Sequence, residues 1–513
     1  MSSGAETAAA SALGRASEKW DARARDRAFV VTVTALGVAL RVVQLDAPLW
    51  YDEMLTLVRF VRLPTAELLT TYTSLNNHIA YSLQAKLAVF AFGDQPWALR
   101  LPALLFGCAS LPLLFQIARD ALGRAAAHVS MLLLAISYHH VWFSQNARGY
   151  TGLLFWALLA THLCSRPGFE NRARLRLAYA ITVGLACYTH LSAALFFAAQ
   201  ALALSLAPAL SARTLGSPYL GAPLSSRLAG SAYGVLATLA LYAPVIPQLL
   251  TTYARQLQPE DLPRASGSGQ AVAEWKTVSW MLAEVVRGFG GASNAVGAAA
   301  ALLLATALLL LGAWLLWKRA PLLTASFAFH VPLTLGLLVV SGMRVWPRYF
   351  FIDLPFFILA VVAGTGAAAR YLARRLGRDG LTGPLAAGAT TLLLIGSSVL
   401  LAKNYRHPKQ DFAGALDFIE SHRKPGDRVG VVGLASVAYR EYYRTDFEEI
   451  EDLAQLEALG RSAARAWVVY AFPTHARNRY PQVVAALKQD YTLAKNFPGT
   501  LGDGDVVVFR GGP

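Results

Sequence analysis

The sequence predicts a polytopic α-helical membrane protein that ends in a small α/β domain. Apolar residues make up 55% of the 513-residue chain, whereas charged residues make up only 15%. Apolar runs of about 18 to 22 residues, each long enough to span the hydrocarbon layer of a bilayer, recur through the first four fifths of the chain. From Lys403 onward, short strand and helix patterns alternate instead, which is typical of an α/β domain.

The formal charge of +15 follows from membrane topology rather than from nucleic-acid binding. Much of the Lys and Arg lies in short loops between apolar runs, as the positive-inside rule requires for cytoplasmic loops. The partner implied by this basic balance is the bilayer with its anionic headgroups, and no nucleic acid is expected. The three cysteines lie in apolar segments without metal-type spacing, so neither a disulfide framework nor a cysteine metal site is indicated.

Charge placement gives the expected order of spans. Residues 1–27 form a basic cytoplasmic tail, and a first uncleaved span follows from about Phe29 to Leu45. The apolar run at 79–92 is short, and counting it as a span would place the later basic loops outside. We therefore predict that residues 65–95 form helices along the outer surface. Further spans are expected at 98–118, 126–143, 150–165, 177–190, 191–209, 229–249, 295–317, 321–341, 349–369 and 383–402, about eleven in total.

This topology divides the chain into a transmembrane domain at 28–402, with outer loops at 46–97 and 250–294, and an extracytoplasmic domain at 403–513. The second outer loop contains a Pro/Gly/Ser-rich hinge followed by an amphipathic segment, which is consistent either with a lid or with a passive surface helix. In the last domain we expect helices at 411–422, 435–443, 451–460 and 475–488, and strands at 428–432, 467–471, 491–496 and 505–509.

The candidate site begins at Leu49-Trp50-Tyr51-Asp52-Glu53, where the first apolar run reaches the outer surface. A carboxylate near low-dielectric surroundings is suited to act as a general base. These five residues alone would favour an ordinary solvated loop. The functional hypothesis gains support because further polar residues of the right chemistry are expected at the same face.

These further residues are cations, a histidine and tyrosines on several outer loops. A guanidinium at a bilayer surface suits the forked recognition of a phosphate, although a single such Arg is more often an interface anchor. Arg41 is expected to pair with Asp46 or with a lipid. The candidate substrate-binding residues are His78, Tyr81, Lys86, Arg148, Tyr150, Arg344, Arg348 and Tyr349.

The order of these signals resembles the integral-membrane glycosyltransferases that use polyprenyl-phosphate sugars. These are GT-C enzymes such as protein O-mannosyltransferases and aminoarabinose transferases, the group of glycosyltransferase family 39. The resemblance covers roughly residues 28–370. Its matching pieces are Leu49-Trp-Tyr-Asp-Glu53, Asn77-His78, Phe92-Gly93-Asp94 with Arg100-Leu-Pro102, Ser144-Gln-Asn-Ala-Arg-Gly-Tyr150 and Arg348-Tyr349. One departure is His78-Ile79-Ala80, where many relatives have proline after the histidine.

The resemblance implies a GT-C fold and assigns roles to several residues. Asp52 would be the catalytic base, and Glu53 a neighbouring carboxylate that orients it or binds metal. Arg148, Tyr150, Arg348 and Lys86 would hold the phosphate of the lipid donor. The implied reaction is an inverting transfer of a sugar from an undecaprenyl-phosphate-like lipid to a hydroxyl of a glycan, lipid or protein. The implied location is the bacterial inner membrane, with the site on the extracytoplasmic side.

Three alternatives remain open from the sequence. Asp52, Glu53 and His78 are ligand types that suit a divalent metal ion, but loops rich in acids and histidine are often metal-free. A transporter or flippase of lipid-linked sugars is a rival, although such proteins tend to show paired repeats and charges near the midplane, neither of which we find. The third alternative is a non-catalytic binding protein whose outer α/β domain is the functional part.

Overall fold

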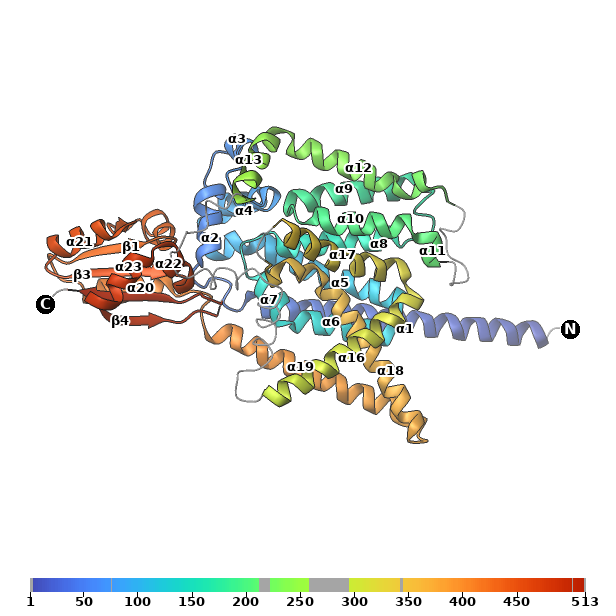
Figure 1. Ribbon diagram of the computed structural model, residues 1–513. Helices are drawn as coiled ribbons and strands as arrows, with labels where there is room; N and C mark the ends of the chain where they lie inside the picture. The colour runs from blue at the N-terminus through green and yellow to red at the C-terminus, as the bar shows by residue number, and fades with distance from the viewer. Residues whose placement is uncertain are drawn as a thin grey trace.

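The computed structural model describes residues 3–74, 76–211, 222–257, 295–341, 345–500 and 502–511. A helical bundle carries a small five-stranded domain at one of its ends, and the N-terminal part of α1 projects from the other end (Figure 1). The predicted fold class, a polytopic helical protein with a C-terminal α/β domain, is confirmed. The predicted lid falls within 250–294, most of which lies outside the described residues, as does Arg344.

Six helical stretches among the described residues are long and apolar enough to cross a membrane. They are Pro96–Leu122, Leu224–Ala254, Leu302–Arg319, Pro321–Val340, Pro347–Arg375 and Asp379–Arg406. Shorter apolar helices accompany them at Ile79–Phe92, Arg124–Ile136, Tyr150–Cys164 and Ala193–Ser205. The protein is therefore a multi-pass membrane protein, and the larger total of about eleven spans stays a prediction.

The bundle is built from α1 (Ser3–Val42), α5 (Pro96–Leu122) and the helical elements that follow α5 as far as Arg406. The others are α6 (Arg124–Ile136), α7 (Tyr138–Ser144), α8 (Tyr150–Cys164), α9 (Ala173–Thr189), α10 (Ala193–Ser205), α11 (Ala207–Ser211), α12 (Leu224–Tyr242), η2 (Ala243–Val245), α13 (Ile246–Leu257), α16 (Ala295–Arg319), α17 (Pro321–Val340), η5 (Pro347–Asp353), α18 (Leu354–Arg375), η6 (Asp379–Leu381) and α19 (Thr382–Arg406).

Two boundaries in the bundle differ from the sequence prediction. The first helix continues back to Ser3, so residues expected as a tail are helical. The span expected at 126–143 is broken into α6 and α7, because Ser137 adopts an extended backbone (φ −60°, ψ 122°) that interrupts the helical dihedrals. This break ends α6 and lets the short helix α7 lead into the turn at residues 145–149.

The segment predicted to lie along the outer surface, between α1 and α5, folds into short helices. It consists of α2 (Tyr51–Thr56), η1 (Leu57–Val61), α3 (Thr65–Thr70) and α4 (Ile79–Phe92). Gly93 ends α4 with a positive φ of 88°, a backbone conformation that favours glycine. These elements lie at the end of the bundle that carries the C-terminal domain (Figure 1).

The C-terminal domain contains one sheet with the strand order β2-β1-β3-β5-β4. Strand β1 is parallel to β2 and to the central strand β3, whereas β5 is antiparallel to both β3 and β4. The sequence prediction missed the short strand β2 and the division of the helix expected at 475–488 into two helices. The elements in order are α20 (Phe412–His422), β1 (Arg428–Val432), η7 (Val437–Tyr442), β2 (Glu448–Ile450), α21 (Leu453–Ser462), β3 (Ala466–Ala471), α22 (Pro473–Arg479), α23 (Pro481–Asp490), β4 (Thr492–Phe497) and β5 (Val506–Gly511).

The domain has one hydrophobic cluster made only of its own residues, and it shares a second cluster with the bundle end. The shared cluster joins buried residues of the domain to those of the first outer segment. The members from the outer segment include Leu49, Met54, Leu57 and Val61, and those from the domain include Phe412, Ala438 and Tyr439. Burial of shared apolar surface therefore fixes the domain against α2.

Candidate active site

Asp52 lies on the first turn of α2, at the membrane-surface end of the bundle. Its carboxylate is mostly buried, and its Oδ2 lies 3.5 Å from Nη1 of Arg148 and 3.5 Å from Nη1 of Arg348. These separations are longer than those of direct hydrogen bonds, so both contacts are ion pairs without tight hydrogen bonding. Three residues from distant parts of the sequence therefore converge, as the sequence analysis expected.

The two guanidinium groups keep donors that no protein atom satisfies. Within the described residues, Arg148 Nε and Nη1 and Arg348 Nε are buried without a hydrogen-bond partner. Arg148 uses only Nη2, which donates to Asn76 Oδ1 at 3.0 Å. Because buried charged donors without partners are costly, this arrangement is suited to an anionic ligand that accepts from them.

Glu53 faces a different environment from that of its neighbour Asp52. It is fully buried and forms a bidentate pair with Arg100 on α5, at 2.7 Å and 2.6 Å. Its Oε1 also accepts from the backbone N–H of Ala147 at 2.8 Å. Burial alone would raise the pKa of Glu53, but the positive charges of Arg100 and Lys409 outweigh it and hold that pKa below its usual range.

This pair connects the two segments that carry the site. Arg100 donates to the carbonyls of Leu45 and Ala47, both at 2.7 Å, while Glu53 binds the turn that contains Ala147. The structure thus places Glu53 in the scaffold below Asp52, where it can orient the loop but cannot reach a substrate with a free oxygen. Sequence reasoning had quoted Arg100 only as part of a motif and had assigned it no role.

A histidine–tyrosine cluster forms one wall beside Arg148. His78 Nδ1 accepts from the backbone N–H of Gly149 at 2.9 Å, so its ring proton is on Nε2. The ring centroids of His78 and His190 are 4.2 Å apart, and Tyr150 lies 5.8 Å from His78. Burial lowers the pKa of His78 well below its usual value, and the nearby cations lower it further, which keeps this histidine neutral.

Gly149 is required for this close packing. A Cβ at that position would lie 2.4 Å from the carbonyl oxygen of Thr189 and 3.2 Å from His78 Nδ1. The glycine in Ser144-Gln-Asn-Ala-Arg-Gly-Tyr150 therefore lets the turn approach the end of α9, which brings Arg148 to Asp52.

Arg348 and Tyr349 lie on η5, at the start of the late span that ends at Arg375. The Arg348 guanidinium also lies 5.1 Å from the ring centroid of Trp346. Tyr349 follows Arg348 on the same element, and the Arg148 guanidinium lies 6.0 Å from the ring centroid of Tyr150. The predicted residues Arg148, Tyr150, Arg348 and Tyr349 are thus brought together around Asp52.

Two predicted substrate-binding residues serve the scaffold instead. Lys86 donates to the carbonyls of Val61 and Leu63 at 3.1 Å and 2.6 Å, and so caps the end of η1. The hydroxyl of Tyr81 donates to the carbonyl of Leu99 at 2.7 Å and is buried. Neither side chain is directed to Asp52 in this structure.

The predicted metal set of Asp52, Glu53 and His78 is not assembled. No group of three or more His, Cys, Asp or Glu side chains that could hold a metal ion occurs in the part of the chain that the structure describes. Both Glu53 oxygens are bound by Arg100, and His78 Nδ1 is bound by a backbone N–H. Two guanidinium groups beside Asp52 also disfavour a second cation there, so these residues do not fit a metal ion.

The structure also corrects the partner that the sequence predicted for Arg41. It was expected to pair with Asp46 or a lipid, but it is fully buried and donates to Ser144 Oγ at 3.1 Å and to the carbonyl of Ala135 at 3.0 Å. Arg41 therefore links α1 to α7, directly before the turn that carries Arg148. Its position inside an apolar run was the only sequence signal of this role.

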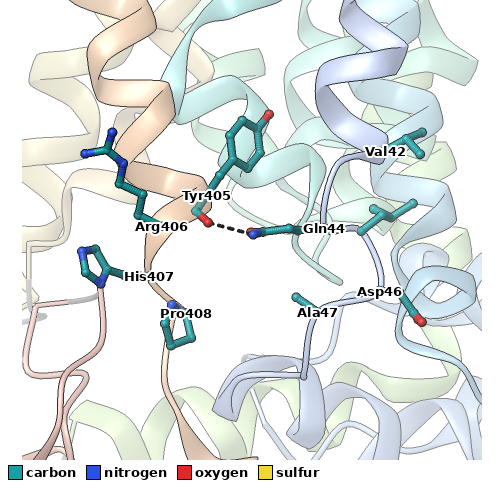
Figure 2. A pocket seen from close by; sticks show the side chains of 9 residues that line it. Val42, Gln44, Asp46, Ala47, Tyr405, Arg406, His407 and Pro408 are labelled. Atoms are coloured by element: carbon teal, nitrogen blue, oxygen red, sulfur yellow. Dashed lines mark hydrogen bonds between the residues drawn. The ribbon is translucent and has the colours of Figure 1, made fainter.

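A cavity of about 420 Å³ lies between the C-terminal ends of α1 and α19 (Figure 2). Gln44 crosses it and donates to the carbonyl of Tyr405 at 2.7 Å. Asp52, Arg148 and Arg348 do not line this cavity. Its lining includes Leu45 and Ala47, whose carbonyls accept hydrogen bonds from Arg100. The lining residues are Val42, Gln44, Leu45, Asp46, Ala47, Tyr405, Arg406, His407 and Pro408.

Comparison with known proteins relates this geometry to one fold family. Residues 78–246 match the family model for dolichyl-phosphate-mannose-protein mannosyltransferase. The fold is similar to that of apo ArnT from Cupriavidus metallidurans, with a TM-score of 0.51, 16% identity, and coverage of 95% of this chain and 100% of ArnT. This chain has the GT-C fold. The predicted resemblance to GT-C glycosyltransferases is thereby confirmed.

A second group of solved structures shares this GT-C fold. The apo oligosaccharyltransferase from Archaeoglobus fulgidus matches with a TM-score of 0.54 and 12% identity, over 90% of this chain and 72% of the other. AglB from the same organism, in complex with an inhibitory peptide and a dolichol-phosphate, matches with a TM-score of 0.51 and 12% identity, over 89% and 70%. A search of curated protein sequences found no significant match.

Proposed function

We propose that the protein transfers a sugar from a polyprenyl-phosphate donor to a hydroxyl acceptor at the membrane surface. The observation that carries this proposal is the Asp52 carboxylate between Arg148 and Arg348, whose remaining buried donors are unsatisfied. A phosphate monoester is the leaving group whose charge such a pair of guanidinium groups stabilises. The GT-C fold and the matched mannosyltransferase segment support the same chemistry.

In the proposed mechanism, the donor phosphate binds between the two guanidinium groups while the lipid tail lies among the apolar helices. The phosphate then shares their positive charge, so Asp52 is less strongly paired and becomes a better base. Asp52 removes the proton of the acceptor hydroxyl as that oxygen attacks the anomeric carbon. The bond from that carbon to the phosphate oxygen breaks, and the lipid phosphate leaves with the bonding electrons. A single displacement inverts the anomeric centre.

In this proposal some residues take part in the chemistry, and others shape the site or hold its loops in place. Asp52 moves the proton, and Arg148 and Arg348 stabilise the developing phosphate charge. The neutral His78 and the ring of Tyr150 form the wall next to Arg148. Glu53 and Arg100 hold the loops that carry these groups and take no part in the chemistry.

The orientation of the site is also part of the proposal. AglB is described in complex with a dolichol-phosphate, and ArnT has the same fold. We place the site and the C-terminal domain on the extracytoplasmic face of a bacterial inner membrane. Asp26 near the start of the first span pairs with Arg124 at the opposite end of the bundle, where the basic loops gather, which supports this orientation.

The test combines binding with product analysis. Purified protein in detergent should bind undecaprenyl phosphate, measured by tryptophan fluorescence, and Arg148→Ala should weaken that binding. Mass analysis of surface glycans, glycolipids and glycoproteins should lose one sugar modification when the gene is deleted, and Asp52→Asn should not restore it. A transporter would move the lipid-linked sugar without cleaving it. Restoration of the modification by Asp52→Asn would therefore refute the proposal.

A further inference from the structure

The end of α19 and the linker from it to the C-terminal domain (residues 407–411) contact both loops of the proposed active site. Asn404 Nδ2 donates to Gln145 Oε1 at 3.1 Å, and Lys409 Nζ donates to the carbonyl of Gln145. One residue later, Gln410 Oε1 accepts from the backbone N–H of Tyr51 at 3.1 Å. Gln145 begins the turn that carries Arg148, and Tyr51 begins the helix that carries Asp52.

Burial removes hydration from the ammonium group of Lys409. Its ammonium group lies 4.8 Å from the ring centroid of Trp142, and burial lowers the pKa of this lysine to about 7, although the charge of Glu53 opposes that shift. A solvated lysine would avoid this loss of hydration. The hydrogen bond from Lys409 to the Gln145 carbonyl therefore restrains the linker and is not a solvated surface contact.

Gln410 completes the start of helix α2. The first backbone N–H groups of a helix have no partner within the helix, and Gln410 supplies one for Tyr51. The glutamine is 1% exposed, so water cannot readily replace it. Loss of this acceptor leaves a partly buried backbone donor without its partner next to Asp52.

The C-terminal domain holds the linker and α2 in this arrangement. The ring of Tyr51 packs edge-on against Phe472 of the domain, with 5.3 Å between centroids. Arg59 on η1 forms an ion pair with Glu441. On the far side of the linker, the carbonyl of Pro408 accepts from the N–H of Thr500 at 3.0 Å.

We propose that Lys409 and Gln410 are positioning residues that hold the Asp52 helix against the Arg148 turn. Through them the C-terminal domain sets the geometry of the active site without supplying a reacting group. This inference rests on the proposed function for its ligand readout. Removal of residues 404–513 would therefore abolish transfer even if the chemistry lies entirely in the bundle, because it deletes this clamp as well as the domain.

The experiment uses full-length protein in detergent and two single substitutions. Lys409→Met removes the bond to the Arg148 turn, and Gln410→Leu removes the acceptor for Tyr51. Lys495→Met and Gln455→Leu are matched controls in the same domain. Lys495 lies over the rings of Phe418 and Phe497, and Gln455 Oε1 accepts the N–H of Glu451 at 2.7 Å. Lys409→Arg is the conservative variant that should retain function.

The readouts are hydrogen exchange of residues 50–56 and 145–150 and the affinity for undecaprenyl phosphate. Lys409→Met should speed exchange in 145–150 and weaken affinity by about five-fold, as expected for one lost hydrogen bond. Gln410→Leu should speed exchange in 50–56 with a smaller change in affinity.

The outcomes separate this inference from the proposed function. Unchanged exchange in both segments, or unchanged affinity of Lys409→Met while Arg148→Ala weakens binding, would overturn the clamp. If the wild-type protein does not bind undecaprenyl phosphate, the proposed function fails, and faster exchange in the two variants would still support the clamp. Equal effects of the control substitutions would show general destabilisation and would also overturn it.

Discussion

The Asp52 carboxylate lies 3.5 Å from the Arg348 guanidinium, although Asp52 follows helix α1 and Arg348 opens a late apolar span. Arg148 approaches the same carboxylate oxygen at the same distance from a third segment. When an acid lies between two cations, a phosphate can bind one of the cations while the acid stays paired with the other. No buried charge is then left unpaired. This relationship leads to predictions that distinguish residues of the chemistry from residues of the scaffold.

Asp52→Asn should reduce sugar transfer at least about 100-fold, since an amide of the same shape cannot accept the acceptor proton. Affinity for undecaprenyl phosphate should not fall, because a competing negative charge has been removed. The measurement is turnover of purified enzyme together with binding. Asp46→Asn, in the same loop, is the control. Among the described residues, the Asp46 carboxylate accepts the N–H of Trp97 at 3.4 Å. Transfer by Asp52→Asn above a tenth of wild type would exclude Asp52 as the base.

Arg348→Ala should weaken binding of undecaprenyl phosphate about 10-fold or more, the effect expected for a charge-assisted hydrogen bond. Arg348→Lys should recover part of the affinity, because an ammonium supplies the charge but not the planar fork. Arg62→Ala is the control, since Arg62 pairs with Asp94 on the surface. Equal affinities of the Arg348→Ala and wild-type proteins would remove Arg348 from the phosphate site.

Lys86→Met should leave the affinity for undecaprenyl phosphate within about two-fold of wild type, because Lys86 caps backbone carbonyls rather than the ligand. Its effect should appear instead as faster hydrogen exchange in residues 57–63. A loss of affinity as large as that of Arg348→Ala would mean that Lys86 turns toward the phosphate when the donor binds.

Glu53→Gln should destabilise the fold by about 3–5 kcal/mol, since it leaves Arg100 buried without its counter-charge. The double variant with Arg100→Met should be less destabilised than Glu53→Gln alone. Thermal unfolding in detergent measures both. The folded pKa of Glu53 is depressed, so its contribution is present above the unfolded pKa and is lost as pH falls through the folded pKa. Equal acid sensitivity of wild type and Glu53→Gln would contradict this linkage.

His190 should make the protein less stable toward acid pH. Burial, together with the charges of Arg148 and Arg348, lowers the pKa of His190 from 6.5 to about 3. Between these values the unfolded chain binds a proton that the folded chain does not, so stability should rise with pH across this window. His190→Gln should flatten that limb of the curve, whereas His407→Gln on the exposed linker should not. An unchanged limb would show that His190 is not the group responsible.

The sequence was sufficient for the fold class and for part of the candidate site. Long apolar runs and alternating strand and helix patterns are local signals, because the bilayer and the sheet each impose their own period on the chain. The positions of Asp52, Arg148 and Arg348 could be inferred to share one face from the same local signals, because the order of spans places loop ends on alternate sides. The same reasoning did not reveal the contacts of Lys86, which donates to two backbone carbonyls, or of Arg41, which donates to Ser144 Oγ and to a backbone carbonyl.

By itself, the sequence determined that this chain crosses a membrane many times and carries an α/β domain beyond the last span. Only the tertiary structure decided which of two adjacent acids faces the cations: on a helix, consecutive side chains point about 100° apart. Asp52 therefore meets Arg148 and Arg348, while Glu53 is held by Arg100. It also decided that Lys409 and Gln410 tie the C-terminal domain to both loops, because contacts between distant segments depend on packing rather than on local periodicity.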